Sequence, residues 1–168
     1  MKKKIWLVAA VLLIFCGCHT KAEPIVEAPI LMQDGQTVQT VVDKMANRIA
    51  IPMPADLDDT ALKNLFSISP THVQEYAGKI SMEPGNMDHF VALRANPKKK
   101  RAVIKGLNRR LSDMQRVFSQ NQTDEDEKIL KGEIVEKGDY VFLAILCEEN
   151  EMVEEDMQEM LGIIEEAF

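Results

Sequence analysis

The N-terminal segment most constrains the rest of the chain, because its pattern marks residues that are removed from the folded protein. Residues 2–4 are lysines, and residues 5–15 (IWLVAAVLLIF) form an uninterrupted apolar run. A basic start followed by an apolar run of this length is typical of a secretory signal peptide. A membrane-spanning helix needs about 20 apolar residues, more than this run supplies even when residues 16–18 are added. We therefore expect residues 1–17 to be a cleaved signal peptide, with a membrane-spanning helix as the alternative.

The apolar run ends in Phe15-Cys16-Gly17-Cys18, which resembles the lipobox of bacterial lipoproteins. In that motif two small residues let the backbone enter the peptidase cleft, and the cysteine thiolate accepts a diacylglyceryl group. Gly17 and Cys16 are small, whereas Phe15 departs from the usual Leu or Val. The pattern predicts cleavage between Gly17 and Cys18 and lipidation of Cys18. The alternative is an ordinary apolar segment that happens to contain cysteines.

Processing at Cys18 would also limit how the remaining chain is stabilised and what it binds. Of the three cysteines, Cys16 would be removed and Cys18 modified, so Cys147 would stand alone and a disulfide framework is excluded. Residues 18–168 are long enough to bury one ordinary core. Loss of the lysines at 2–4 would make the net charge of −7 more negative still. Nucleic acid would be repelled by such a domain and is not expected as a partner.

Residues 37–168 show the pattern of a single α+β domain, preceded by a tether over residues 18–36 that holds two prolines and a glycine. The periodicity, caps and turns predict these elements: a helix over 37–49, a short helix after 56–59, strands over 73–82 and 90–95, a helix from 96–97 to 118, strands over 129–135 and 139–147, and a helix over 150–167. The order α-α-β-β-α-β-β-α predicts a four-stranded antiparallel sheet from two hairpins with helices packed on it. Residues 140–147 are apolar on both faces and predict a central strand.

Four segments of this domain resemble a known family. They are DLDDTALKNLFSI, THVQEYAGKISM, NMDHFVALRA and GEIVEKGDYVFLAIL. Together with the order of elements over about residues 37–167, they look like domain-of-unknown-function family 4358, whose members are small bacterial lipoproteins, mostly of Gram-positive anaerobes. The matching residues are packing and turn patterns, so the resemblance implies a fold and a location but no activity.

Two histidines with nearby acids form the first candidate site. His72 and His89 lie near one predicted hairpin, and with Glu75 and Asp88 they would offer metal ligands. The local spacing of four-ligand sites is missing, so exposed histidines at strand ends are the favoured interpretation. We expect no metal and no other cofactor.

Two further features have plain structural explanations. Cys147 ends an apolar strand, and its neighbours Glu148 and Glu149 disfavour the thiolate, so we expect a buried apolar side chain instead of a nucleophile. The carboxylates between residues 148 and 166 lack the loop spacing and turn glycine of a calcium site, so we expect a solvated helical face. No catalytic residue is assigned.

A basic cluster, Lys98, Lys99, Lys100 and Arg101, stands out in this acidic chain. Cations at the start of a helix oppose its dipole, so they are either tolerated or used. One interpretation is contact with anionic headgroups or wall polymer. The other is a solvated face paired with the acidic segments 124–127 and 148–159.

These features predict a membrane-anchored lipoprotein on the extracytoplasmic face of the cell membrane, attached through acylation of Cys18 and acting as a non-catalytic binding or interaction module. One alternative is a hydrolase whose site is assembled from distant residues, Glu75, Asp88 or His89 among them. The other is a structural subunit of a membrane assembly, which predicts an exposed apolar patch on the sheet face opposite the helices.

Overall fold

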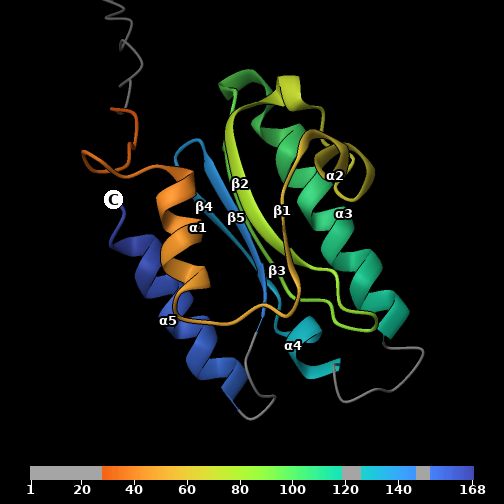
Figure 1. The fold of residues 1–168 in the computed structure, drawn as a ribbon. Helices are drawn as coiled ribbons and strands as arrows, with labels where there is room; N and C mark the ends of the chain where they lie inside the picture. The colour runs from red at the N-terminus through yellow and green to blue at the C-terminus, as the bar shows by residue number, and fades with distance from the viewer. Residues whose placement is uncertain (1–27, 119–125, 147–151) are drawn as a thin grey trace, which may run out of the picture.

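The computed structural model describes residues 28–118, 126–146 and 152–168, which form a sheet with helices on both faces (Figure 1). Five strands make the sheet: β1 (Pro54–Asp56), β2 (Val73–Ser81), β3 (His89–Ala95), β4 (Glu133–Lys137) and β5 (Tyr140–Ile145). The helices are α1 (Val38–Ala46), α2 (Asp59–Asn64), α3 (Lys100–Phe118), α4 (Asp126–Leu130) and α5 (Val153–Glu165), with 3-10 turns η1 (Pro70–His72) and η2 (Pro97–Lys99).

The sheet is antiparallel throughout and has the order β1-β2-β3-β5-β4. Two hairpins, β2–β3 and β4–β5, supply four of the strands, and β3 pairs with β5 to join them. Their turns contain Gly85 and Gly138, both with positive φ, which glycine adopts without a steric penalty. The two predicted hairpins are therefore confirmed, and residues 140–145 of the predicted central strand lie inside the sheet as β5.

Strands β3 and β5 bury side chains on both faces of the sheet. Phe90 and Phe142 point toward α1 and α5, whereas Val91 and Leu143, one position further along each strand, belong to the core beneath α2, α3 and α4. Successive side chains of a strand alternate between faces, so two apolar faces require two covering layers. Figure 1 shows this arrangement, with α1 and α5 on one side of the sheet and α2 and α3 on the other.

The predicted α+β class and antiparallel sheet are confirmed, but the predicted four strands and element order are wrong. A fifth strand, β1, pairs with β2 from Pro54↔Ser81 to Asp56↔Lys79. No strand was predicted between the helix over 37–49 and the short helix after 56–59. A proline is tolerated at the first residue of an edge strand, where no neighbour needs its missing N–H.

The second difference is α4, whose last two residues, 129 and 130, were predicted as the start of a strand. Ile129 is fully buried against α3 and the sheet, and the strand begins only at Glu133. A short apolar run does not distinguish a buried helical turn from a strand. The element order is therefore α-β-α-β-β-α-α-β-β-α in the described residues.

Local sequence explains where the first two helices begin. Thr37 and Thr40 form a reciprocal capping box at the start of α1, each side chain accepting a hydrogen bond from the other residue's backbone N–H. Asp58 caps α2 by accepting from the backbone N–H of Ala61 at 2.7 Å. The apolar residues that recur at steps of three and four along α1 and the residues after it are all buried: Val38, Val41, Val42, Met45 and Ile49.

The two edges of the sheet are short or charged. β1 has only three residues, and Asp56 on it forms an ion pair with Lys79 of β2 at 2.6 Å. β4 exposes Glu133 and Glu136. Within the described residues no helix is long and apolar enough to cross a membrane.

The packing of α3 against the segment after α2 makes a stability prediction. A Cβ on Gly106 would lie 2.5 Å from Cγ1 of Ile68 and 2.6 Å from the carbonyl oxygen of Phe66. We expect Gly106→Ala to destabilise the protein by about 1–3 kcal/mol, because the backbone must shift to admit the methyl group. Chemical denaturation measures the change.

Gly162 in α5 is the matched control, because it is exposed and a Cβ there would meet nothing within 4 Å. Gly162→Ala should be stabilising by about 0.4–1 kcal/mol, the usual effect of alanine in a helix. Equal effects of the two substitutions would contradict the close contact at Gly106.

Candidate functional site

The residues of the predicted anchor lie outside the described part of the chain. This holds for Gly17 and Cys18, and also for Cys147, whose expected burial is likewise untested. Cleavage and lipidation therefore stay predictions. The described structure begins at Ala28, within the predicted tether.

The described part of the tether contacts the domain. The backbone N–H of Gln33 donates to the carbonyl of Ala167 at 2.8 Å, and Met32 packs against the core between the sheet and the α1–α5 layer. Ile30 lies so close to Gly138, in the β4–β5 turn, that a Cβ on this glycine would be 2.8 Å from the Cβ of Ile30. Residues 30–33 thus lie against the end of the domain that carries the β4–β5 turn.

The basic cluster lies at the same end of the domain. Lys98 and Lys99 are in η2, and Lys100 and Arg101 are in the first turn of α3. Lys100 lines a hollow of about 290 Å³ together with Ala28, Pro29 and Ile30. In Figure 1 the start of α3 and the incoming chain are both at the upper end of the molecule.

Pairing of the cluster with residues 124–127 and 148–151 stays a prediction, because the structure describes none of these side chains. Lys100 forms an ion pair with Glu136 of β4 at 2.9 Å. Lys98, Lys99 and Arg101 are exposed and have no ion pair within the described residues. Two acids of α5 pair elsewhere, Glu154 with Lys131 and Glu159 with Arg48.

The four proposed metal ligands do not come together. His72 precedes the first residue of β2, whereas His89 pairs with Ile80 near the other end of that strand, about 23 Å away at 3.3 Å per residue. Glu75 lies at the His72 end, 3.5 Å from Arg94. No group of three or more possible ligand residues is found in the part of the chain that the structure describes.

His89 is buried, with 2% of its surface exposed, so the prediction of exposed histidines at strand ends is wrong for this residue. Its Nδ1 lies 2.9 Å from the carbonyl oxygen of Met87, and its Nε2 lies 3.0 Å from a guanidinium nitrogen of Arg110. A carbonyl only accepts and a guanidinium only donates, so the proton is on Nδ1 and the ring is neutral. Burial lowers the pKa of His89 to about 4, and the charge of Arg110 contributes.

A buried ion pair lies beside this histidine. Lys128 of α4 is 3.0 Å from the carboxylate of Asp88, and both side chains are 5% exposed or less. Phe66, after α2, packs edge-on to the His89 ring at 6.1 Å between centroids. These contacts join α2, α3 and α4 to the start of β3. Both ring nitrogens of His89 have hydrogen-bond partners within the protein, so this histidine contributes to packing and not to a ligand site.

Sequence reasoning missed Arg110 and Lys128, although one signal was present. Arg110 lies three residues after the buried Leu107 and four before the buried Met114, which places it beside the core-facing stripe of α3. Lys128 carries no such signal, because its burial depends on helix α4, which was not predicted. Burial also lowers the pKa of Arg110.

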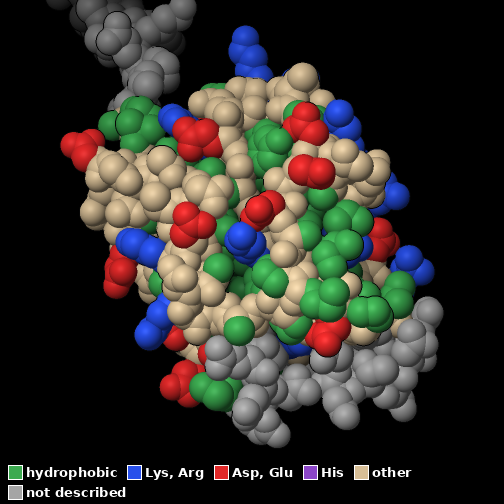
Figure 2. Space-filling model, in the orientation of Figure 1, with side chains coloured by type: hydrophobic (Ala, Val, Ile, Leu, Met, Phe, Trp, Pro, Cys, Tyr) green, Lys and Arg blue, Asp and Glu red, His purple; other side chains and the backbone are tan. Residues whose placement is uncertain are grey.

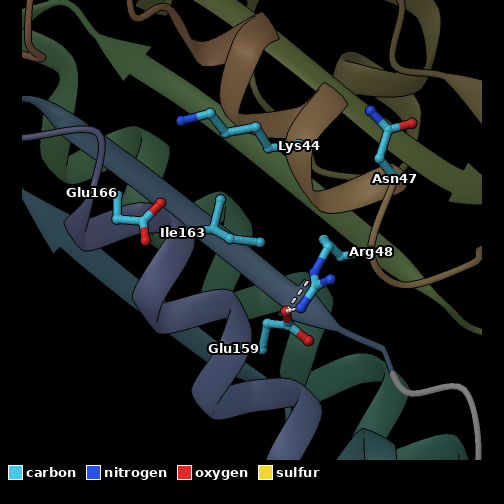
Figure 3. A pocket seen from close by; sticks show the side chains of 6 residues that line it. All are labelled: Lys44, Asn47, Arg48, Glu159, Ile163 and Glu166. Atoms are coloured by element: carbon cyan, nitrogen blue, oxygen red, sulfur yellow. Dashed lines mark hydrogen bonds and ion pairs between the residues drawn. The ribbon is translucent and has the colours of Figure 1, made fainter.

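A groove between α1 and α5 presents charges of both signs (Figure 3). It has a volume of about 430 Å³. Lys44 of α1 and Arg48, two residues after its end, line one side of the groove. Glu159 of α5 and Glu166, the residue after its end, line the other side, with Ile163 between the two acids. The ion pair between Arg48 and Glu159 crosses the groove. The volume is within the range of small-molecule sites, but the lining is more polar than usual.

An apolar hollow of about 320 Å³ lies at the β1 edge, beside α2. Ala55, Ala61, Leu65 and Met82 contribute its apolar lining. Met82 is 62% exposed and its neighbour Met53 is 64% exposed. Figure 2 shows hydrophobic side chains gathered on this side of the molecule.

The part of the chain that forms the sheet and one of its two helical layers matches a family model. The model is Domain of unknown function (DUF4358), and it matches residues 51–146. The chain therefore belongs to this family. The match runs from just before β1 to the residue after β5 and leaves out α1 and α5. No curated protein and no solved structure matches the chain.

Burial of His89 predicts a pH-dependent stability. The pKa of His89 is about 4 in the folded chain and 6.5 as the ordinary value, so the unfolded chain binds more protons between these values. Stability is therefore complete above this window and falls as the pH drops through it, by about 3 kcal/mol in total. Chemical denaturation across the window measures this loss.

The control is His89→Gln, whose side-chain amide still forms hydrogen bonds but does not titrate. Carboxylates also titrate near the lower limit, so the informative quantity is the difference between the wild-type and variant curves. An identical pH dependence of both proteins would show that His89 does not cause it.

Proposed function

We propose that this protein is a lipid-anchored binding module on the outer face of a bacterial cytoplasmic membrane. The pattern of residues 1–18 supports the anchor, and membership of the family agrees with a domain of unassigned activity. Only nine residues separate Cys18 from Ala28, and the ten steps between them span at most about 35 Å when fully extended. The lipid would therefore hold the domain close to the membrane surface.

The observation that carries the binding role is the groove between α1 and α5. Its charged side chains come from two helices and face one another across an open hollow that suits a small ligand with charges of both signs. A ligand that replaced the Arg48–Glu159 ion pair would find a cation and a carboxylate already in place. The proposal includes neither a catalytic step nor a cofactor.

The residues that suggested the hydrolase alternative do not lie together in an open site. Asp88 and His89 are enclosed and engaged with Lys128 and Arg110, and Glu75 lies toward the other end of β2. The structural-subunit alternative predicted an apolar patch on a bare sheet face, but helices cover both faces. The apolar hollow at the β1 edge is a different surface, and it favours this alternative as a second candidate function.

The anchor is tested by the mass and location of the protein in its native host. We expect membrane-extracted protein to begin at Cys18 and to carry the mass of a diacylglyceryl group. Cys18→Ala should stay unprocessed or be released from the membrane, since the thioether cannot form. A wild-type chain that retains residues 1–17 and carries no lipid would overturn the proposal.

The groove is tested by native mass spectrometry of the lipidated protein extracted from membranes. We expect a bound small molecule that is lost in Lys44→Gln/Arg48→Gln, because both cations of the groove are removed while their aliphatic stems are kept. Met53→Gln/Met82→Gln at the apolar hollow is the control. Loss of an associated protein subunit in the methionine variant alone would instead favour the structural-subunit function.

A further inference from the structure

The basic cluster is unbalanced by its surroundings. Lys98, Lys99 and Arg101 project into solvent without an ion pair among the described residues. The nearest acids of the neighbouring hairpin strand and last helix are already used, Glu136 by Lys100 and Glu165 by Lys137. Asp139 is half-buried in the hollow beside Lys100. Three cations without an ion pair among the described residues therefore remain at one end of a protein that is acidic as a whole.

The position of the cluster at the start of α3 does not stabilise the helix. Lys98 and Lys99 lie in η2, and Arg101 lies in the first turn of α3, where positive charge is opposed by the helix dipole. The exposed side chains also contribute nothing to the core beneath α3. An external anion would remove both the repulsion and the imbalance.

The chain that leads from Cys18 into the domain indicates which surface lies next to the basic cluster. Ile30 packs on Gly138, and Ala28 to Ile30 share a hollow with Lys100, so the chain from Cys18 arrives beside the cluster. At full extension residues 18–28 reach about 35 Å. A lipid at Cys18 would keep this end next to the headgroups of one leaflet. It would not bring a soluble or wall-bound polymer to the cluster in the same way.

We propose that the end bearing Lys98, Lys99 and Arg101 docks on anionic lipid headgroups of the leaflet that holds the Cys18 lipid. This inference rests on the proposed anchor. Docking orients the domain, with the turn between β2 and β3 and helix α4 pointing away from the membrane (Figure 1). Each basic residue near an anionic surface shifts the equilibrium by about fivefold, so three shift it by about 100-fold.

The test compares lysine accessibility in the lipidated protein on two kinds of vesicle, phosphatidylcholine alone and phosphatidylcholine mixed with phosphatidylglycerol. A water-soluble acylating reagent and peptide mass spectrometry give the labelling rate of each lysine. We expect Lys98 and Lys99 to react several-fold more slowly on the anionic vesicles. Lys131, near the start of β4 and therefore at the far end, should react equally on both. At about 1 M salt the screening length is about 3 Å, and the difference should vanish.

A matched pair of variants assigns the effect to the cluster. Arg101→Glu should restore much of the labelling of Lys98 and Lys99 on anionic vesicles. Arg109→Glu, an equal charge change two turns along the same helix at an exposed site, should leave the protection intact.

The outcomes separate this inference from the anchor itself. Flotation of the protein with neutral vesicles reports the lipid, so its loss would overturn the proposed function. Flotation with identical labelling on both vesicles would overturn the docking and leave the anchor standing. Protection by added teichoic acid on neutral vesicles, without protection by phosphatidylglycerol, would overturn the lipid contact in favour of a wall polymer.

Discussion

The requirement to cover both faces of β3 and β5 determines the architecture of this protein. Each strand sends alternate apolar side chains to opposite faces, and every residue of β5 is buried. A single helical layer would leave half of these side chains in water, at about 25 cal/mol for each Å² of apolar surface. The matched family region supplies α2, α3 and α4 for one face. The flanking residues supply α1 and α5 for the other.

Local patterns predicted most of the elements because each depends on near neighbours in sequence. The steps of three and four in α1, the cap at Asp58 and the turn glycines Gly85 and Gly138 act over a few residues. β1 has no such signal, since it owes its existence to backbone pairing with β2, twenty or more residues away. The choice between helix and strand at Ile129 likewise depends on contacts with α3 and the sheet.

The candidate sites divide in the same way. The run of four basic residues can be read directly from the sequence. Its position beside Ile30 and Gly138 depends on the folded chain. His89 was visible as a histidine, whereas its neutral state depends on Arg110, twenty-one residues further along. The groove lies between α1 and α5, the first and last helices of the sequence, so no local sequence pattern predicts it.

The short and charged edges of the sheet would have a consequence if the protein is anchored to a membrane as proposed. Tethering in two dimensions raises the local concentration of a protein, and flat exposed strands then recruit one another into aggregates. β1 presents three residues, one of them a proline, and β4 presents two glutamates whose charges repel a second copy. Such edges permit dense coverage of a cell surface by separate molecules.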